Sequence, residues 1–212
     1  MRTIYLHGFA SSPASRKARL FVEKLAQRKI TVEAPELGPD FEHLTLTSQL
    51  AILDRVVAGQ PACLIGSSMG GYLAALYAAG HPEIQRLVLL APAFAFYQLW
   101  VNEMGPEKLD QWRKNGTISV FHYGAGHNAP LNYGLMEDAR TYPPFPDFPQ
   151  LCLLLHGLKD TVVPFAASAR FAAGHPNVKL ISFNSGHELT DVLDEIWNVS
   201  STFLLGNSTE RV

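Results

Sequence analysis

One serine of this sequence lies in a pattern that is typical of a serine nucleophile. Ser68 is the centre of Gly66-Ser67-Ser68-Met69-Gly70, which follows a short apolar run at 62–65 and precedes an apolar stretch that favours a helix. This arrangement fits the G-x-S-x-G turn, in which a sharp bend between strand and helix lifts the central serine above the edge of a sheet. The flanking glycines carry no Cβ atoms that would clash as strand and helix close together.

A possible acid and a possible base follow this serine, in the chain order Ser68, Asp160, His187. A serine hydroxyl is a poor nucleophile at neutral pH and needs a base that takes its proton. We expect His187 to be this base, and later the acid for the leaving group, while Asp160 accepts the other imidazole N–H. Since Asp160 and His187 each follow an expected strand, the topology predicts that both face Ser68 at one sheet edge.

Attack on a carbonyl group creates a negative oxygen, which must be met by hydrogen-bond donors. The backbone N–H of Met69 directly follows the serine, and that of Phe9 lies in His7-Gly8-Phe9 at the end of the first expected strand. In this kind of site the two donors come from those two positions. The sequence therefore predicts Phe9 and Met69 as the oxyanion hole.

The other histidines compete with His187 for a role. His7 and His156 each precede a glycine at a strand end, where we expect them to brace loop backbones. His156 is only four residues before Asp160, so we expect it not to pair across the site. His122 and His127 are the candidates for a metal site, but no cysteine or carboxylate stands at ligand spacing beside them.

Three further acids lie close to His187 in the sequence, namely Glu188, Asp191 and Asp194. We expect them in the first turn of the last helix, where the helix dipole favours negative charge. Another possible location for the acid, after the preceding strand, reads Ala91-Pro92-Ala93. Asp160 is therefore the preferred acid.

The elements that must position these residues alternate along the chain. Runs of continuous apolar residues, such as 86–91, are typical of parallel strands that are covered on both faces. A first helix is expected from an N-cap at Ser12-Pro13 to about Arg28. The alternation predicts a doubly wound, mostly parallel sheet of about six strands with helices on both faces. Strands are expected at 3–6, 30–34, 62–65, 86–91, 151–155 and 178–183, and further helices around 46–57, 69–79, 164–173 and 189–203.

Residues 93–149 interrupt this alternation. They predict two short helices near 96–103 and 106–114, a β-like pair near 119–123 and 131–133, and a proline-rich exit. This segment holds 11 of the 22 aromatic residues, and a structureless loop of this length would be unusual. We interpret it as a cap over the carboxyl edge of the sheet. Most of its aromatics are expected to form its own core and a few to line a substrate pocket.

The length and composition are typical of a single globular domain, which we expect to span residues 1–212. Hydrophobic residues make up 47% and charged residues 17%, and the net charge of −2 with no basic patch argues against a nucleic-acid partner. No apolar run is long enough for a membrane span, and the chain begins without a signal peptide, so we expect a cytoplasmic protein. Cys63 and Cys152 lie in apolar strands and are expected to be buried free thiols. The sequence leaves the oligomeric state open.

Four motifs together resemble the α/β-hydrolases: LHGFASSP at 6–13, GSSMGGY at 66–72, HGLKDTVVP at 156–164 and SGH at 185–187. The first two are similar to those of small bacterial esterases of the YqiA-like group. The chain starts at the first parallel strand, so we expect the two leading antiparallel strands of larger α/β-hydrolases to be missing. The resemblance implies hydrolysis of carboxylic esters through an acyl-serine intermediate, and it does not identify the natural ester. Our own first hypothesis is a small-molecule ester with a small to medium acyl chain.

The resemblance implies no metal and no cofactor, and it leaves two alternatives. The same three residues could hydrolyse a thioester, a peptide or a carbon–carbon bond. Cleavage of a nucleotide-bearing thioester would favour basic residues in the 93–149 segment, which offers only Lys108, Arg113, Lys114 and Arg140. A non-catalytic binding protein of this fold would be expected to have lost one of the three residues, and none is missing.

Overall fold

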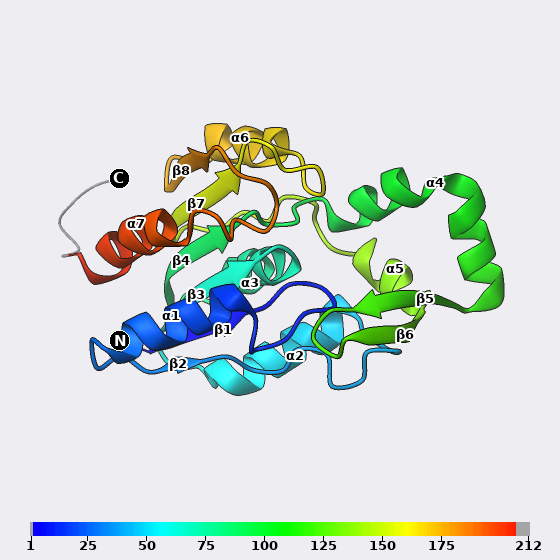
Figure 1. Ribbon diagram of the computed structural model, residues 1–212, viewed down its shortest axis with the longest axis horizontal. Helices are drawn as coiled ribbons and strands as arrows, with labels where there is room; N and C mark the ends of the chain where they lie inside the picture. Colours follow the sequence, from blue (N-terminus) through cyan, green and yellow to red (C-terminus); the bar gives the residue numbers. More distant parts are fainter. Residues whose placement is uncertain (1, 207–212) are drawn as a thin grey trace.

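Six parallel strands form the centre of the molecule, in the order β2-β1-β3-β4-β7-β8 (Figure 1). The computed structural model describes residues 2–206. The predicted six-stranded, doubly wound parallel sheet is confirmed. The strands are β1 (Thr3–Leu6), β2 (Val32–Glu33), β3 (Ala62–Ser67), β4 (Ile84–Leu90), β7 (Leu151–Gly157) and β8 (Val178–Phe183).

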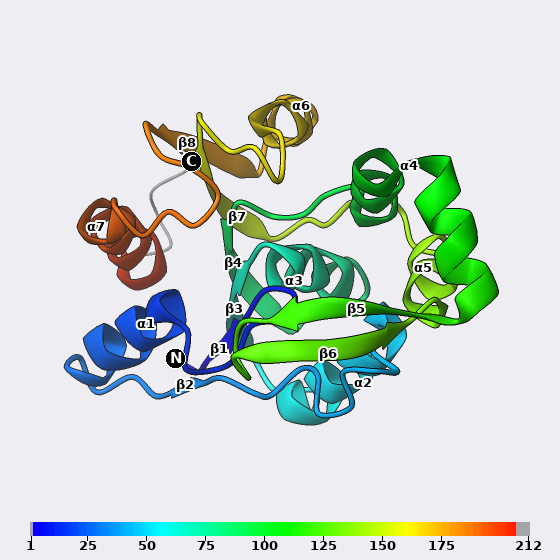
Figure 2. The ribbon, with the colours of Figure 1, turned by 45° about the vertical axis from the view of Figure 1, so that its right-hand side comes forward.

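Helices cover both faces of this sheet, as predicted. Helices α1 (Arg16–Ala26) and α7 (Leu193–Leu205) pack on one face, and α2 (Leu46–Val57), α3 (Met69–Gly80) and α6 (Phe165–Gly174) lie on the other (Figure 2). Successive strand residues point to opposite faces, so the apolar runs supply two separate cores. In β4, for example, Leu87 and Leu89 join the α3 side, while Val88 and Leu90 join the α1 and α7 side.

The segment 93–149 lies between β4 and β7 in the sequence and beyond the carboxyl ends of the strands in space (Figure 1). It comprises helix α4 (Phe96–Asn115), the antiparallel pair β5 (Thr117–His122) and β6 (His127–Asn132), and helix α5 (Gly134–Ala139). The two expected helices are the halves of α4, which kinks at Gly105, where φ is +72°, just before Pro106. Helix α5 was not predicted.

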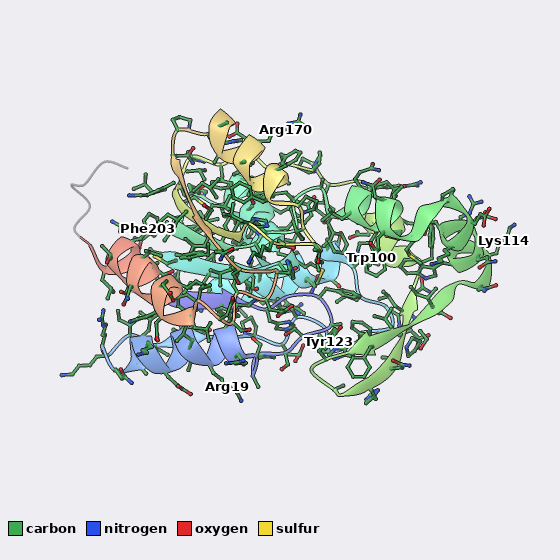
Figure 3. The ribbon with its side chains drawn as sticks, turned by 45° about the horizontal axis from the view of Figure 1, so that its top comes forward. Arg19, Trp100, Lys114, Tyr123, Arg170 and Phe203 are labelled. Atoms are coloured by element: carbon green, nitrogen blue, oxygen red, sulfur yellow. The ribbon has the colours of Figure 1, made fainter. Side chains whose placement is uncertain are left out.

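Aromatic side chains hold this segment together. Trp112 is fully buried, and its Nε1–H donates to the carbonyl of Leu131 at 3.0 Å. The ring of Trp100 contacts that of Trp112 and that of Phe9, with centroids 5.5 and 5.3 Å apart. Figure 3 shows Trp100 on the inner side of the segment and Lys114 at its outer end. The aromatics therefore connect the segment to the end of β1.

Several predicted boundaries were wrong, among them the second strand of the inserted pair, which was expected near 131–133 and spans His127–Asn132. The first helix is capped by Ser15, not Ser12, because the Ser12 carbonyl closes a separate turn with the Ser15 N–H at 3.1 Å. The strand expected at 30–34 is reduced to Val32–Glu33 at the edge of the sheet. The last helix begins at Leu193 rather than near Leu189, whose positive φ of +54° is incompatible with a helix.

Two other expectations concern single features. Cys63 and Cys152 are buried free thiols, as predicted, and burial raises the pKa of both. Across residues 2–206, no helix combines the length and the apolar character that a bilayer span requires.

Candidate active site

Ser68 occupies the turn between β3 and α3, and its backbone is strained. Its φ of +54° and ψ of −119° are unusual for a residue with a side chain. A Cβ atom at Gly66 would overlap the backbone of Gly70, and one at Gly70 would overlap the carbonyl of Leu6. Both flanking glycines are therefore required for the close approach of α3 to β1 and β3. The predicted sharp turn around the serine is present.

The structure brings Ser68, His187 and Asp160 into one chain of hydrogen bonds. The Ser68 hydroxyl donates to His187 Nε2 at 3.0 Å, and His187 Nδ1–H donates to Asp160 Oδ2 at 2.7 Å. The Asp160 carboxylate is fully buried, whereas 12% of the His187 side chain is exposed. This geometry allows the imidazole to remove the proton of Ser68 while the carboxylate fixes its tautomer.

Asp160 is surrounded by donors. Its Oδ1 accepts the backbone N–H groups of Val162 and Val163 at 2.9 and 2.8 Å, and its Oδ2 accepts from His156 as well as from His187. Burial acts to raise the pKa of Asp160, but the hydrogen bonds from His156 and His187 outweigh it and hold this pKa well below its usual range. The carboxylate is therefore ionised at neutral pH.

His156 is the residue whose role the sequence analysis misjudged. As expected, it braces a loop backbone, since its Nε2 lies 2.9 Å from the carbonyl of Val163. However, the same nitrogen lies 3.0 Å from Asp160 Oδ2, so the expectation that it would not pair across the site was wrong. The chain turns sharply after Gly157, which returns Asp160 to the end of its own strand. The contact depends on this turn, which the four-residue separation by itself does not predict.

His7 has the bracing role that was predicted for it. Its Nε2 accepts the backbone N–H of Leu37 at 3.2 Å, and it lies 3.3 Å from the carboxylate of Glu36. Burial lowers the pKa of His7. This residue fixes the loop after β2 and takes no part in the chain of hydrogen bonds around Ser68.

The two expected oxyanion donors lie next to the serine. Met69 begins α3 directly after Ser68, and Phe9 follows Gly8, where an added Cβ would lie 3.3 Å from the Ser68 Cβ. Within residues 2–206, neither the Phe9 nor the Met69 N–H donates to a protein acceptor. Two N–H groups beside the serine are thus available to a ligand, and their use as an oxyanion hole stays a prediction.

The acids near His187 lie mostly in a loop. Only Asp194 belongs to the first turn of α7, so the expectation for Glu188 and Asp191 was wrong, because the helix starts later. Asp191 instead accepts a hydrogen bond from the Ser185 hydroxyl. The buried Lys17 on α1, which sequence reasoning missed, donates its Nζ–H to the Glu188 carbonyl at 2.8 Å. Both contacts fix the loop that carries His187.

The two histidines that were weighed as metal ligands lie opposite each other on β5 and β6. His122 and His127 are paired in the antiparallel register. In the part of the chain that the structure describes, no group of three or more His, Cys, Asp or Glu side chains is arranged to hold a metal ion.

A cavity of about 650 Å³ opens beside Phe9, in the loop that follows β1. Phe9 forms part of its wall, α4 forms a second side, and the loop after Asp160 forms the third. The lining is mainly apolar, and 650 Å³ is in the range of small-molecule sites. Its α4 and loop residues include Phe96, Leu99, Trp100, Met104, Val162 and Val163.

Comparisons with known proteins agree with this architecture. The model of the uncharacterised protein family UPF0227 matches residues 2–204. No curated protein matches the chain. Est1E from Butyrivibrio proteoclasticus, solved with ferulic acid bound, superposes with a TM-score of 0.85 at 22% identity, covering 99% of this chain and 90% of its own.

Two further solved structures share the fold. Alpha/beta hydrolase domain-containing protein 10 from mouse has a TM-score of 0.76 at 18% identity, with 95% of this chain and 90% of that chain covered. A monoacylglycerol lipase from Paleococcus ferrophilus has a TM-score of 0.71 at 17% identity, with 96% and 93% covered. At these identities, the comparison establishes the α/β-hydrolase fold.

Proposed function

We propose that this chain, which belongs to the UPF0227 family and has the α/β-hydrolase fold, is a serine hydrolase that cleaves carboxylic esters. The observation that carries the proposal is the chain of hydrogen bonds from Ser68 through His187 to the buried, ionised Asp160. A structural serine would not need a strained backbone, a neighbouring imidazole and two free N–H groups beside it. The names of the solved neighbours include a lipase, which is compatible with ester cleavage.

The residues would act in two half-reactions. His187 Nε2 takes the proton of Ser68 as Oγ attacks the ester carbonyl, and the N–H groups of Phe9 and Met69 stabilise the oxyanion. His187 then returns this proton to the departing alcohol, which leaves an acyl-serine. In the second half, His187 activates a water molecule that hydrolyses the acyl-serine, and Asp160 stabilises the imidazolium in both steps.

The cavity beside Phe9 supports small to medium apolar acyl groups. Its wall is formed largely by apolar side chains of α4, and burial of each CH₂ group stabilises a bound chain by about 0.8 kcal/mol. In this proposal, the segment 93–149 is a cap that supplies the acyl site, within a single domain over residues 1–212. Small to medium chains fit the cavity volume of about 650 Å³.

Cleavage of nucleotide-bearing thioesters has weaker support. Of the four basic residues in the segment, Arg113 and Lys114 both contact the Asp110 carboxylate, at 2.7 and 2.6 Å. Their charges are thus partly neutralised rather than available to phosphate groups. Side-by-side rates on matched oxygen esters and thioesters separate the two activities, and a large thioester preference would contradict the ester proposal.

The test is a series of p-nitrophenyl esters from acetate to palmitate, with the wild type and Ser68→Ala. We expect turnover in the wild type and essentially none in a folded Ser68→Ala variant, since no other group replaces the nucleophile. Ser67→Ala is the matched control, because Ser67 is the adjacent serine at the end of β3 and stands outside the hydrogen-bonded chain. It should retain most of the activity.

A fluorophosphonate probe gives an independent measurement. It should label Ser68 in the wild type and in Ser67→Ala, and nothing in Ser68→Ala, with the modified peptide identified by mass spectrometry. Residual turnover or labelling in Ser68→Ala would show that another residue is the nucleophile. A wild type that neither turns over esters nor reacts with the probe would contradict the proposal as a whole.

A further inference from the structure

His156 presents a second imidazole to the carboxylate that holds His187. Its Nε2 lies 3.0 Å from Asp160 Oδ2, the same oxygen that accepts from His187 Nδ1 at 2.7 Å. The His156 side chain is fully buried, as is the carboxylate, so water does not mediate or replace this contact. One buried carboxylate oxygen is therefore shared by two imidazole rings.

The surroundings of His156 assign its protonation. Nε2 faces two acceptors, Asp160 Oδ2 and the Val163 carbonyl, and therefore carries the hydrogen. Nδ1 lies 2.7 Å from Ser168 Oγ on α6, whose hydroxyl donates to it when the ring is neutral. Ser168 is itself fully buried. This contact fixes the ring, so that its Nε2–H is shared between the Asp160 carboxylate and the Val163 carbonyl.

The four hydrogen bonds to Asp160 have different origins. Its Oδ1 is held by the backbone N–H groups of Val162 and Val163, which any sequence could supply. Its Oδ2 has only side-chain donors, and one of these, His187, must change its protonation state during the reaction. His156 is the donor to Oδ2 that stays in place throughout.

We propose that His156 is a positioning residue, which holds the Asp160 carboxylate ionised and aimed at His187 by donating Nε2–H to Oδ2. This inference rests on the proposed ester hydrolysis for its kinetic readout. His156 is not hydrogen-bonded to Ser68 and lies outside the lining of the cavity, so it acts on the site through Asp160 and the Val163 carbonyl. Without it, a buried carboxylate would lose a hydrogen bond that it cannot replace with water. His187 would then be the remaining side-chain donor to Asp160 Oδ2.

Loss of this donor has a defined consequence for His187. A carboxylate with one fewer donor is a stronger acceptor for the remaining imidazole, and it stabilises the protonated ring more. The acid limb of the kcat profile, which follows protonation of His187, should therefore move to higher pH. The other charged groups around the pair are Lys17 on α1, and Lys159, Glu188 and Asp191 on the neighbouring loops, and these are unchanged in the test.

The kinetic experiment compares His156→Leu, which has no donor, with His156→Gln, whose amide N–H can donate to Oδ2. We expect kcat per fluorophosphonate-reactive site to fall about 10- to 100-fold in His156→Leu, with KM little changed, because the reacting groups are misplaced while the acyl site is intact. The acid limb should move to higher pH. His156→Gln should recover part of both effects.

Phe171→Leu is the matched control for lost stability. Phe171 is buried on α6 near Ser168 but lies in the apolar core and does not touch Asp160. It should lower the thermal midpoint without moving the acid limb. The proposal would be overturned if His156→Leu left both kcat per reactive site and the acid limb of the kcat profile unchanged. It would also be overturned if the acid limb moved to lower pH.

A measurement without substrate separates failure of this inference from failure of the proposed function. In protein labelled with ¹⁵N-histidine, two-bond ¹H–¹⁵N spectra should show His156 protonated at Nε2 only, and the His187 signals should titrate at higher pH in His156→Leu than in the wild type. A His156 ring protonated at Nδ1 only, or a His187 titration that is the same in both proteins, would overturn the inference even if the wild type hydrolyses no ester.

Discussion

The loops at the strand ends and the inserted segment 93–149 are built on different kinds of contact. The loops are fixed by contacts of the backbone. Glycines at 66 and 70 allow the close approach of α3, and the backbone N–H groups of Val162 and Val163 hold the Asp160 carboxylate. The inserted segment is held mainly by aromatic side chains, with Trp112 at its centre. Backbone contacts to the rest of the molecule include Gly124 N–H to Ala10 and Asn132 N–H to Glu42, at 3.2 and 2.7 Å.

This difference teaches how one fold can keep its chemistry and vary its substrate. In the proposed function, the loops carry Ser68, Asp160 and His187, so changes to these three residues should alter the rate on every ester by the same factor. Side chains of α4 line the cavity, so changes to these side chains should alter the rates on some esters more than on others. The ratio of the kcat/KM values on two esters therefore distinguishes a substitution that affects the chemistry from one that affects the choice of acyl chain.

In the loops, after Ser68→Ala, the largest effect is expected from Asp160→Asn. The amide cannot accept the His187 Nδ1–H in the same way and favours the wrong tautomer, so kcat should fall by up to about 10⁴-fold. The fall should be equal for acetate and medium-chain esters, measured as kcat/KM on each. A loss confined to one chain length would contradict the assignment of Asp160 to the chemistry.

The same variant has a pH signature in stability. Because the pKa of Asp160 is lowered in the folded protein, the carboxylate contributes stability that is present above its unfolded value of about 3.9 and is lost as the pH falls toward the folded value. The difference in unfolding free energy between the wild type and Asp160→Asn should therefore narrow as the pH falls below about 4. Urea unfolding at a series of pH values measures it.

In the inserted segment, the largest effect is expected from Trp112→Ala. This substitution opens a cavity where a fully buried indole was, and it leaves the Leu131 carbonyl without its donor. The free energy of unfolding should fall by about 3–5 kcal/mol. Tyr123→Ala is the control from the same segment, since that residue is 77% exposed, and it should change stability by less than about 0.5 kcal/mol. Equal losses would show that the segment has no core of its own.

The structure could be predicted from the sequence where apolar runs, glycine spacing or strand topology determine it. The six strands and the turn at Ser68 follow from continuous apolar runs and from glycine spacing, and the meeting of Ser68, Asp160 and His187 follows from topology, because parallel strands end at one edge. The two halves of α4 could be predicted from Gly105-Pro106.

Sequence reasoning failed where a contact depends on the exact path of a loop. His156 and Asp160 meet because the chain reverses after β7, and Lys17 reaches Glu188 across 171 positions of sequence. Neither contact has a periodic signal. The start of α7 was predicted too early, because the apolar Leu189 lies in the loop before the helix and not in the helix.

The smallest of the expected effects, and the most specific, belongs to Trp100→Ala. Trp100 forms an apolar wall of the cavity on α4, so its removal takes away surface against which a medium acyl chain would be buried. We expect the ratio of kcat/KM on octanoate to that on acetate to fall about tenfold, with the acetate rate nearly unchanged. Phe121→Ala is the matched control, because Phe121 is a half-exposed aromatic of the same segment that lies outside the lining of this cavity.

Trp100 also tests the boundary between the two regions, because its ring packs against that of Phe9, with centroids 5.3 Å apart. If Trp100 only selects the acyl chain, acetate turnover survives its removal, since the Phe9 N–H keeps its place at the end of β1. If the acetate and octanoate rates fall together, then the inserted segment also positions the loop that carries Phe9. In that case the contact between Trp100 and Phe9 would link the inserted segment to the rate on every ester, and not only to the choice of acyl chain.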